Sequence, residues 1–133
     1  YADWETAFRI NTMAPMKMAE CFVEQVARSG QRKLVTLSSK MGSVADNGSG
    51  GSYIYRSSKT AVNMVMKSLS IDLATRGIAV GVLHPGWVLT DMGGPNALIN
   101  ATQSVSGLRR VIADLTLDNA GRFIAYDGKE IPW

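Results

Sequence analysis

Helical and strand-like segments alternate along this chain, and this order restricts the fold more than any other feature. Two short runs, 33–38 and 78–83, are almost continuously apolar, and a third strand-like run follows at 122–126. Nearly continuous apolar runs are typical of parallel strands that are covered on both faces. Because a helical segment precedes each run, the sequence predicts an α/β fold in which helices cover both faces of a parallel sheet.

The segments between these runs are predicted to be helices, and the two longer ones are apolar on more than one face. Pro15 lies inside the first helix and should bend or break it, because proline lacks an amide hydrogen. A helix that is apolar on two sides needs cover on both of them, and the sheet supplies only one cover. The predicted helices span residues 3–29, 52–75 and 103–117.

The predicted sheet is thin, because sheets with helices on both faces usually have more strands. The first strand, 33–38, would leave one apolar edge unpaired, and such an edge favours association with another chain. The chain also starts at Tyr1, without a methionine. We therefore expect residues 1–133 to form one partial domain, with half of a larger sheet outside it.

Composition excludes several classes of protein. The net charge is only +3, and the 14 basic residues are scattered, which argues against a nucleic-acid surface. No apolar run reaches membrane-spanning length, and no basic and apolar leader opens the chain. The single Cys21 allows no internal disulfide, so we expect a reducing, cytoplasmic location. One Cys and one His give no cluster of metal ligands, so no metal site is expected.

Tyr55 and Lys59 are the first candidate site residues. They are four residues apart on a predicted helix, so their side chains lie on one face, about one turn apart. A nearby ammonium group favours the phenolate form of a tyrosine, and such a pair can donate or accept a proton near neutral pH. The same pattern is also found in ordinary surface pairs, and the surrounding residues therefore decide between the two interpretations.

Polar residues that close the apolar strands favour a functional site. Ser38 and Ser39 follow the first strand, and His84-Pro85-Gly86 follows the second. In parallel α/β sheets, functional residues gather where strands end and the chain turns into the next helix. Asn11 lies in the first helix, close to the irregularity expected at Pro15.

These motifs resemble those of the short-chain dehydrogenase/reductase superfamily. They occur in the order and at roughly the spacing of that superfamily, at Asn11, 37–39, 55–59 and 85–90. The match covers essentially the whole chain, as the carboxyl-terminal half of such an enzyme. The chain is most similar to the C-factor/sniffer-like carbonyl reductases, and the segments that carry this narrower match are 42–51, 55–59, 92–97 and 126–133.

The resemblance implies a fold, a reaction and a set of catalytic roles. The fold would be the second half of a Rossmann-type doubly wound sheet, with about three strands and three main helices. Tyr55 would be the general acid in carbonyl reduction, or the base in alcohol oxidation. Lys59 would stabilise the phenolate and bind the nicotinamide ribose. Ser39, the second serine of its pair, would polarise the substrate carbonyl, and Asn11 would hold the first helix open around a water that relays protons to Lys59.

The resemblance also implies NADP or NAD as cofactor and a small carbonyl compound or secondary alcohol as substrate. The residues expected to contact the cofactor are Tyr55, Lys59, Pro85, Gly86, Val88 and Thr90. The apolar residues expected in the substrate pocket are Met41, Trp87, Leu89 and Met92. Members of the superfamily usually associate through the two long helices, so we expect a homodimer or tetramer that buries 3–29 and 52–75.

Two other residues stay outside the predicted site. His84 is the only histidine, and we interpret it as a strand-end residue because the Tyr55–Lys59 pair already handles protons. Tyr53 lies two residues before Tyr55, so it points elsewhere on the helix and would pack or form a pocket wall.

One departure from the superfamily limits this interpretation. Its members begin with a Thr-Gly-(three residues)-Gly-(one residue)-Gly turn, which lets the backbone and a helix amino terminus approach the pyrophosphate. The only close glycines here, Gly48, Gly50 and Gly51, lie in a mid-chain loop. We therefore expect this chain alone to bind NAD(P)H poorly or not at all. Two alternatives stay open: the catalytic half of a longer oxidoreductase, or a truncated, non-catalytic remnant that associates with itself.

Overall fold

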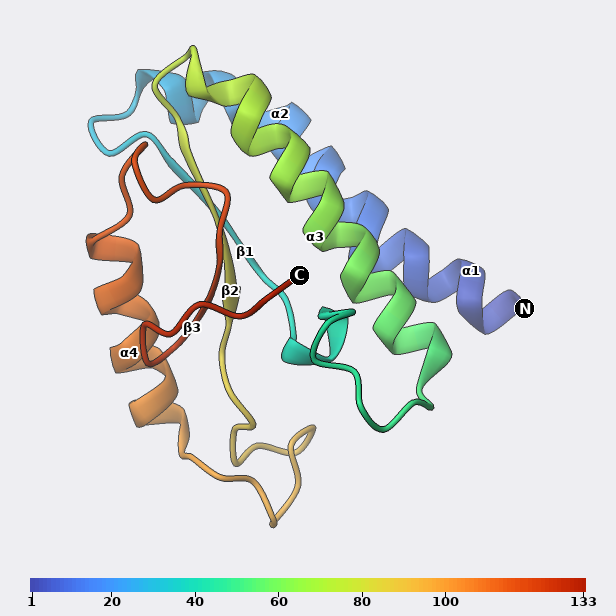
Figure 1. Ribbon diagram of the computed structural model, residues 1–133. Helices are drawn as coiled ribbons and strands as arrows, with labels where there is room; N and C mark the ends of the chain where they lie inside the picture. The colour runs from blue at the N-terminus through green and yellow to red at the C-terminus, as the bar shows by residue number, and fades with distance from the viewer.

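A computed structural model describes residues 1–133, and it shows the alternation of helices and strands that the sequence predicts (Figure 1). A π turn and a 3-10 turn, η1 and η2, are the additional elements. The elements are α1 (Ala2–Phe8), η1 (Arg9–Met13), α2 (Ala14–Arg28), β1 (Lys33–Leu37), η2 (Lys40–Gly42), α3 (Tyr53–Ala74), β2 (Ala79–His84), α4 (Ala101–Ala113) and β3 (Phe123–Ala125).

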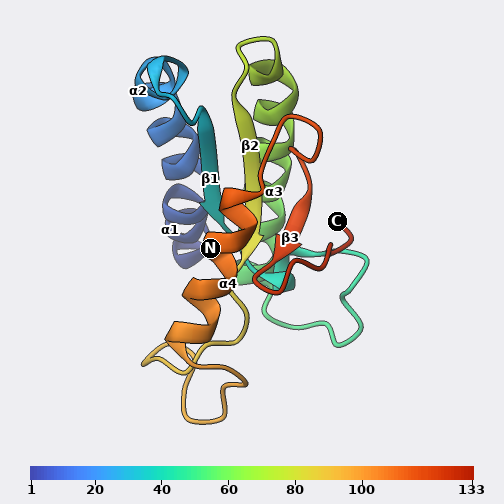
Figure 2. The ribbon, with the colours of Figure 1, turned by 90° about the vertical axis from the view of Figure 1, so that its left-hand side faces the viewer.

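The strands form one parallel sheet in the order β1-β2-β3. β1 pairs with β2 from Lys33–Ala79 to Leu37–Leu83, and β3 pairs with the other edge of β2. Helices α1, α2 and α3 lie on one face of the sheet, and α4 lies on the other (Figures 1 and 2). The predicted α/β fold, a parallel sheet with helices on both faces, is therefore confirmed. The outer edge of β1 has no partner strand, as the thin sheet implied.

The core lies between the sheet and the long helices. Its side chains that are at most 1% exposed are Ile78 just before β2, Val80 and Val82 in β2, Val62 and Met66 in α3, and Phe123 in β3. Burying a side chain of this size contributes about 1.5–3 kcal/mol each. Val23 and Val26 of α2 pack against the same cluster, so both long helices are held against the sheet. None of the helices is both long and apolar enough to cross a membrane.

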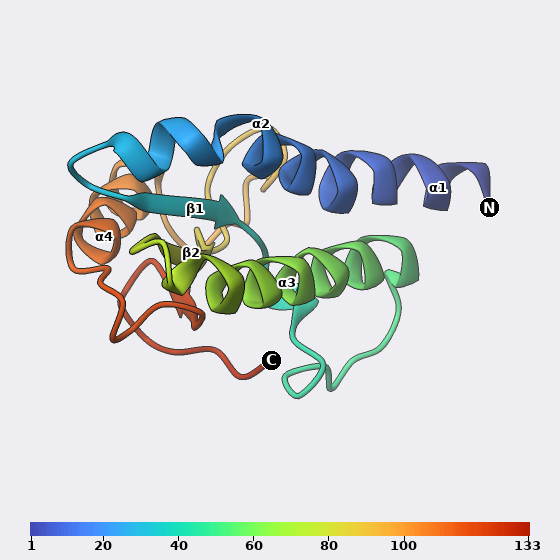
Figure 3. The ribbon, with the colours of Figure 1, turned by 90° about the horizontal axis from the view of Figure 1, so that it is seen from above.

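The predicted helix 3–29 is helical over almost its whole length, but it contains the π turn η1. Pro15 follows this turn and lies at the start of α2. Since proline has no amide hydrogen, it cannot donate to the Asn11 carbonyl four residues earlier, and the helix widens there. A local π turn therefore stands where we expected Pro15 to bend or break the helix. Figure 3 shows that α1, before this turn, and α2, after it, run beside α3.

Helix α4 is shorter than the predicted helix 103–117. It begins at a capping box of Asn100 and Gln103 and ends at Ala113. Lys33 Nζ donates to the carbonyls of Ile112 and Ala113, at 2.6 and 2.8 Å. These bonds satisfy carbonyl groups at the end of the helix, and a cation is favourable there. The end of α4 thus depends on a side chain of β1, a contact that no local pattern indicates.

Two contacts hold α4 against the carboxyl ends of β2 and β3. Ser104 Oγ donates to the Pro85 carbonyl at 2.6 Å. At Gly107 the helix touches the backbone of Tyr126, and a Cβ there would lie 2.2 Å from the Tyr126 carbonyl oxygen. The absence of a side chain at Gly107 therefore lets α4 approach the turn that follows β3.

At their carboxyl ends, β1 and β2 are joined by two hydrogen bonds beyond the ladder. The Ser38 amide donates to the Leu83 carbonyl at 2.7 Å, and the Lys40 amide donates to His84 Nδ1 at 3.1 Å. Burial lowers the pKa of His84, the nearby Lys40 ammonium lowers it further, and the Asp127 carboxylate acts in the opposite direction. Neutral His84 therefore connects the ends of the two strands, which refines its interpretation as a strand-end residue.

Gly107→Ala should destabilise the chain by about 1–3 kcal/mol, because the added methyl group collides with the Tyr126 backbone. Alanine favours helices more than glycine does, so helix propensity alone would raise the stability. A loss of stability would therefore be due to the collision with Tyr126. Urea denaturation of Gly107→Ala beside Gly30→Ala measures it, since a methyl group at Gly30 meets no atom within 4 Å. An unchanged or higher unfolding free energy in Gly107→Ala would contradict the packing.

Stability should fall as the pH drops below about 6.5, the ordinary pKa of histidine. The unfolded chain then takes up a proton at His84, whereas the lowered pKa of His84 delays this uptake in the folded chain. The loss continues until the pH reaches the folded pKa. Urea denaturation between pH 7.5 and 5 should show this decrease in the wild type and a smaller one in His84→Gln. Equal decreases in both proteins would show that His84 is not the group responsible.

Candidate active site

Ser39 lies where β1 ends and the chain turns into η2. Its Oγ accepts a hydrogen bond from the Met41 amide at 3.2 Å, and its carbonyl accepts one from the Gly42 amide at 2.8 Å. The neighbouring Ser38 points into the protein, where its Oγ donates to Asn63 Oδ1 at 2.6 Å. The two serines therefore differ. The Ser38 hydroxyl forms a hydrogen bond inside the protein, whereas the Ser39 hydroxyl lies at the turn.

Tyr55 and Lys59 lie on one face of α3 near its beginning, and both are half-buried. The Lys59 ammonium lies over the Tyr55 ring, 5.8 Å from its centroid. Lys59 Nζ also donates to the Leu37 carbonyl at 3.5 Å, at the end of β1. Burial lowers the pKa of Lys59, because desolvation disfavours the ammonium form. Lys59 thus reaches the strand end from which Ser39 follows, and its ammonium also lies over the Tyr55 ring.

Asn11 contacts α3 at Ser58, the residue before Lys59. Its Nδ2 donates to Ser58 Oγ at 3.1 Å, and Thr12 Oγ1 donates to the Ser58 carbonyl at 2.9 Å. Both side chains come from the π turn η1, so this turn is fixed against α3 beside the Tyr55–Lys59 pair. The predicted water relay from Asn11 to Lys59 stays a prediction.

Sequence reasoning missed two residues that shape this region. Trp4 Nε1 donates to Ser57 Oγ at 2.9 Å and attaches α1 to the beginning of α3. Ser58 is fully buried and receives Asn11. A serine within a helix carries no distinctive signal, but the tryptophan near the start of an amphipathic helix is a large side chain whose N–H needs a partner.

Pro85 and Gly86 turn the chain at the end of β2. Gly86 has a φ of +86°, and a Cβ there would lie 2.7 Å from Ile99 and 2.9 Å from Tyr126. Glycine is therefore required at this position, because the backbone angle is left-handed and because a side chain would collide with Ile99 and Tyr126. The following segment returns toward the turn, where Val88 pairs with Ile99.

The segment after this turn carries three of the four predicted pocket residues, and they are mostly exposed. Trp87 is 49% exposed, Leu89 53% and Met92 93%. Trp87 Nε1 donates to the Gly93 carbonyl at 2.6 Å, so its ring is fixed along the segment. Met41, the fourth of these residues, lies in η2 and is half-buried. The substrate pocket that these four residues would form stays a prediction.

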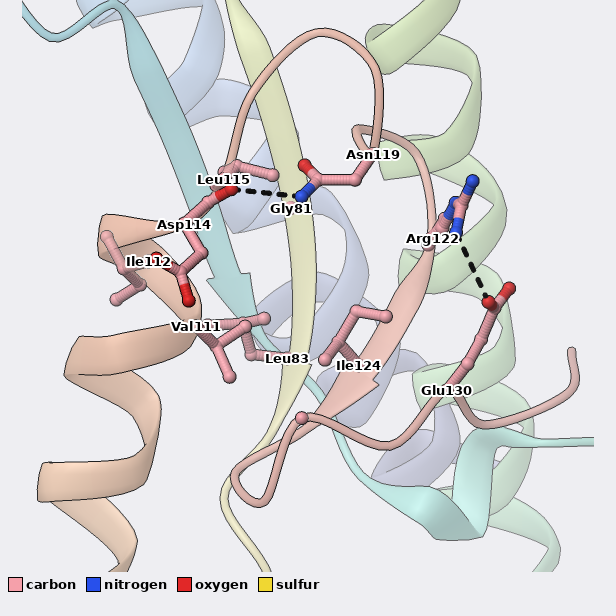
Figure 4. A pocket seen from close by; sticks show the side chains of 11 residues that line it. Gly81, Leu83, Val111, Ile112, Asp114, Leu115, Asn119, Arg122, Ile124 and Glu130 are labelled. Carbon is pink, nitrogen blue, oxygen red and sulfur yellow. Dashed lines mark hydrogen bonds and ion pairs between the residues drawn. The ribbon is translucent and has the colours of Figure 1, made fainter.

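Two hollows are present elsewhere, and only one involves a predicted site residue. The first lies between α1 and the beginning of α3, and its lining residues are Tyr1, Trp4, Ala7, Ser52, Tyr53, Ile54 and Tyr55. The second is a cavity of about 260 Å³ between the end of α4 and the sheet (Figure 4). The Arg122–Glu130 ion pair lies at this second cavity, which contains none of the predicted site residues.

The polar groups of this region are of the kind that bind one end of a nicotinamide dinucleotide. A half-buried lysine beside a tyrosine on α3, and a glycine turn at the end of β2, would offer contacts to a nicotinamide and its ribose. The pyrophosphate needs a glycine-rich turn that directly joins a strand to a helix. Here Gly50 and Gly51 have φ values of +68° and +69° but lie in an exposed loop that η2 separates from β1. In this chain, no group of three or more His, Cys, Asp or Glu side chains is placed to hold a metal ion.

Comparisons with known proteins agree with this geometry. The sequence profile of the family described as short chain dehydrogenase matches residues 1–100. C-signal from Myxococcus xanthus is 44% identical over 133 residues, which is 100% of this chain and 80% of that protein. Carbonyl reductase Sniffer of D. melanogaster superposes with a TM-score of 0.94 at 33% identity. NADPH-bound carbonyl reductase from chicken fatty liver superposes with a TM-score of 0.93 at 30% identity.

The superpositions include all of this chain but only 58% of the chain in each of the two solved structures. This chain therefore spans less than two thirds of their length. Three observations agree: the family profile, the parallel sheet, and the motif residues at the ends of β1 and β2 and the beginning of α3. The chain belongs to the short-chain dehydrogenase family.

Proposed function

We propose that this chain is the proton-transfer part of an NADP(H)- or NAD(H)-dependent oxidoreductase that interconverts a carbonyl compound and a secondary alcohol. The observation that carries the proposal is the placement of Tyr55 and Lys59 on α3, with the Lys59 ammonium at the strand end that leads into Ser39. Family membership supports it, as do the carbonyl reductases among the similar solved structures, one of which is NADPH-bound. We place the chain in the C-factor/sniffer-like subgroup.

Each catalytic side chain has a distinct task in this proposal. Tyr55 gives its phenolic proton to the substrate oxygen in reduction and takes a proton in oxidation. The Lys59 ammonium, close to the Tyr55 ring and partly desolvated, stabilises negative charge on the phenol oxygen. Ser39 Oγ accepts its bond from the Met41 amide, so the hydroxyl hydrogen is free to donate to the substrate oxygen. A donor fixed at the oxygen where charge develops lowers the barrier.

A nicotinamide, when bound, supplies or accepts the hydride. Lys59 and Tyr55 would contact its ribose. The turn after β2 would contact its carboxamide through Pro85, Gly86, Val88 and Thr90. The family's glycine-rich turn for the pyrophosphate would have to come from outside these 133 residues.

The substrate we infer is an apolar carbonyl compound. The side chains proposed to meet it are Met41, Trp87, Leu89 and Met92. Most of this surface is exposed in the chain alone, and bound substrate or further protein would cover it. We place the protein in the cytoplasm, because its one cysteine, Cys21, is a free thiol.

We also propose that copies of the chain associate through α1, α2 and α3. Large apolar side chains of η1, α2 and α3 are 49 to 67% exposed: Ile10, Met13, Met18, Phe22, Met64 and Ile71. Exposed apolar side chains mark an interaction site where they form one patch. A twofold partner would cover both helices at once, and a dimer or tetramer results.

Tyr55→Phe in the complete protein should lower NADPH-dependent carbonyl reduction by about 10²–10⁴-fold, because the phenolic proton is lost while the ring remains. Tyr53→Phe is a matched control, since Tyr53 lies two residues away and is 74% exposed. Initial rates with an aromatic ketone measure both variants. A Tyr55→Phe protein that keeps the wild-type rate would refute the assignment.

Met64→Lys should shift the chain from oligomer toward monomer, because it places a charge in the proposed interface, where Met64 is 67% exposed. Met92→Lys makes the same change in the segment after β2 and should leave the assembly intact. Light scattering coupled to size exclusion measures the mass of each. A wild-type chain that is entirely monomeric would contradict the proposed association.

A further inference from the structure

The segment that carries Ser39 is attached to α3 on both sides of this residue, and Asn63 takes part in both attachments. Before Ser39, Ser38 Oγ donates to Asn63 Oδ1 at 2.6 Å. After Ser39, Asn63 Nδ2 donates to the Gly42 carbonyl at 3.4 Å. The amide of one side chain therefore bridges the strand end and the end of the η2 turn, with Ser39 between them.

Other residues of α3 contact the same turn. Thr60 Oγ1 donates to the Gly42 carbonyl at 2.8 Å, and Arg56 Nη1 donates to the Met41 carbonyl at 3.4 Å. A Cβ at Gly42 would lie 2.9 Å from the backbone carbon of Lys59 and 3.0 Å from Asn63 Nδ2. The turn thus lies directly on the helix backbone at Lys59, and side-chain donors hold it there.

Asn63 belongs to the same helix face as the proton-transfer pair. Tyr55, Lys59 and Asn63 follow each other at intervals of four residues, which places them in one row along α3. Lys59 is the middle residue of this row. The third member of the row therefore binds the Ser39 segment on both sides of Ser39.

The Ser38–Asn63 bond is buried, which makes its loss costly. Ser38 is 4% exposed and Asn63 is 2% exposed. Water does not replace the lost partner of a buried polar group. Replacing Asn63 would therefore leave the Ser38 hydroxyl without its acceptor, and replacing Ser38 would leave Asn63 Oδ1 without its donor. A shift of the turn away from α3 would break the bond, and the bond therefore restrains the turn.

We propose that Asn63 is a positioning residue that fixes Ser39 relative to Tyr55 and Lys59 by binding Ser38 and Gly42 at once. The proposal rests on the proposed function for its effect on catalysis, but the restraint itself is a property of the chain. Asn63 touches neither substrate nor cofactor in this role. It acts through Ser39.

Amide hydrogen exchange in the 133-residue chain tests the restraint without any activity. In Asn63→Leu and in Ser38→Ala, the Met41 and Gly42 amides, which both bind Ser39, should exchange at least ~10-fold faster than in the wild type. Ser70→Ala is the matched control, because Ser70 is also on α3, is 7% exposed and lies away from η2. Unchanged β2 amides confirm that each variant is folded.

A double-mutant cycle in the complete protein tests the consequence for catalysis. Asn63→Leu and Ser38→Ala should lower kcat for carbonyl reduction by about 10–100-fold, with KM for NADPH within about twofold, because a small misplacement of a catalytic group has effects of this size. In a Ser39→Ala background, Asn63→Leu should have no further effect on kcat. A residue that only stabilises the fold would lower kcat additively.

The two measurements separate the failure of this inference from the failure of the proposed function. If Met41 and Gly42 exchange at wild-type rates in both variants, or if the kcat losses add, Asn63 does not position Ser39. If the wild-type protein reduces no carbonyl compound but both variants accelerate exchange as expected, the proposed function is wrong and the restraint stands. Faster exchange together with non-additive kcat losses supports both.

Discussion

The contact between the η2 turn and helix α3 determines where Ser39 lies relative to Tyr55 and Lys59. At Gly42 the turn touches the backbone at Lys59, and a Cβ there would lie 2.9 Å from it. Only glycine permits so close an approach. Because Ser39 begins this turn and Lys59 lies beneath it, a strand end and a helix are joined into one site. The remaining contacts, from Thr60, Asn63 and Arg56, hold the turn in that place.

The site is also held by the hydrogen bonds that join the carboxyl ends of β1 and β2. The Ser38 amide extends the β1–β2 ladder, and the Lys40 amide reaches the ring of His84. On the other side of the sheet, α4 holds the Pro85–Gly86 turn through Ser104. The two loops that leave the sheet are therefore linked at the strand ends, and each has a further support of its own, one from α3 and one from α4. The proposed proton-transfer groups are held by the first support, and the proposed carboxamide turn is held by the second.

Most of the fold could be predicted from the sequence, because it depends on patterns that are local. The nearly continuous apolar runs predicted buried parallel strands, and the alternation with helices predicted their order. Tyr55 and Lys59 could be paired because helical spacing alone puts them on one face. The contacts that could not be predicted join residues far apart in the chain. The cap that Lys33 forms on α4 and the bond between Ser38 and Asn63 depend on tertiary packing, and Pro15 gave a π turn because the helix could widen around it.

The central claim is that this chain holds the proton-transfer groups of its family without the turn that binds the pyrophosphate. A calorimetric titration of NADPH into the 133-residue chain tests this claim most directly, with the complete protein titrated in parallel. We expect saturable binding to the complete protein and none to the chain alone. Micromolar binding of NADPH by the chain alone would contradict it.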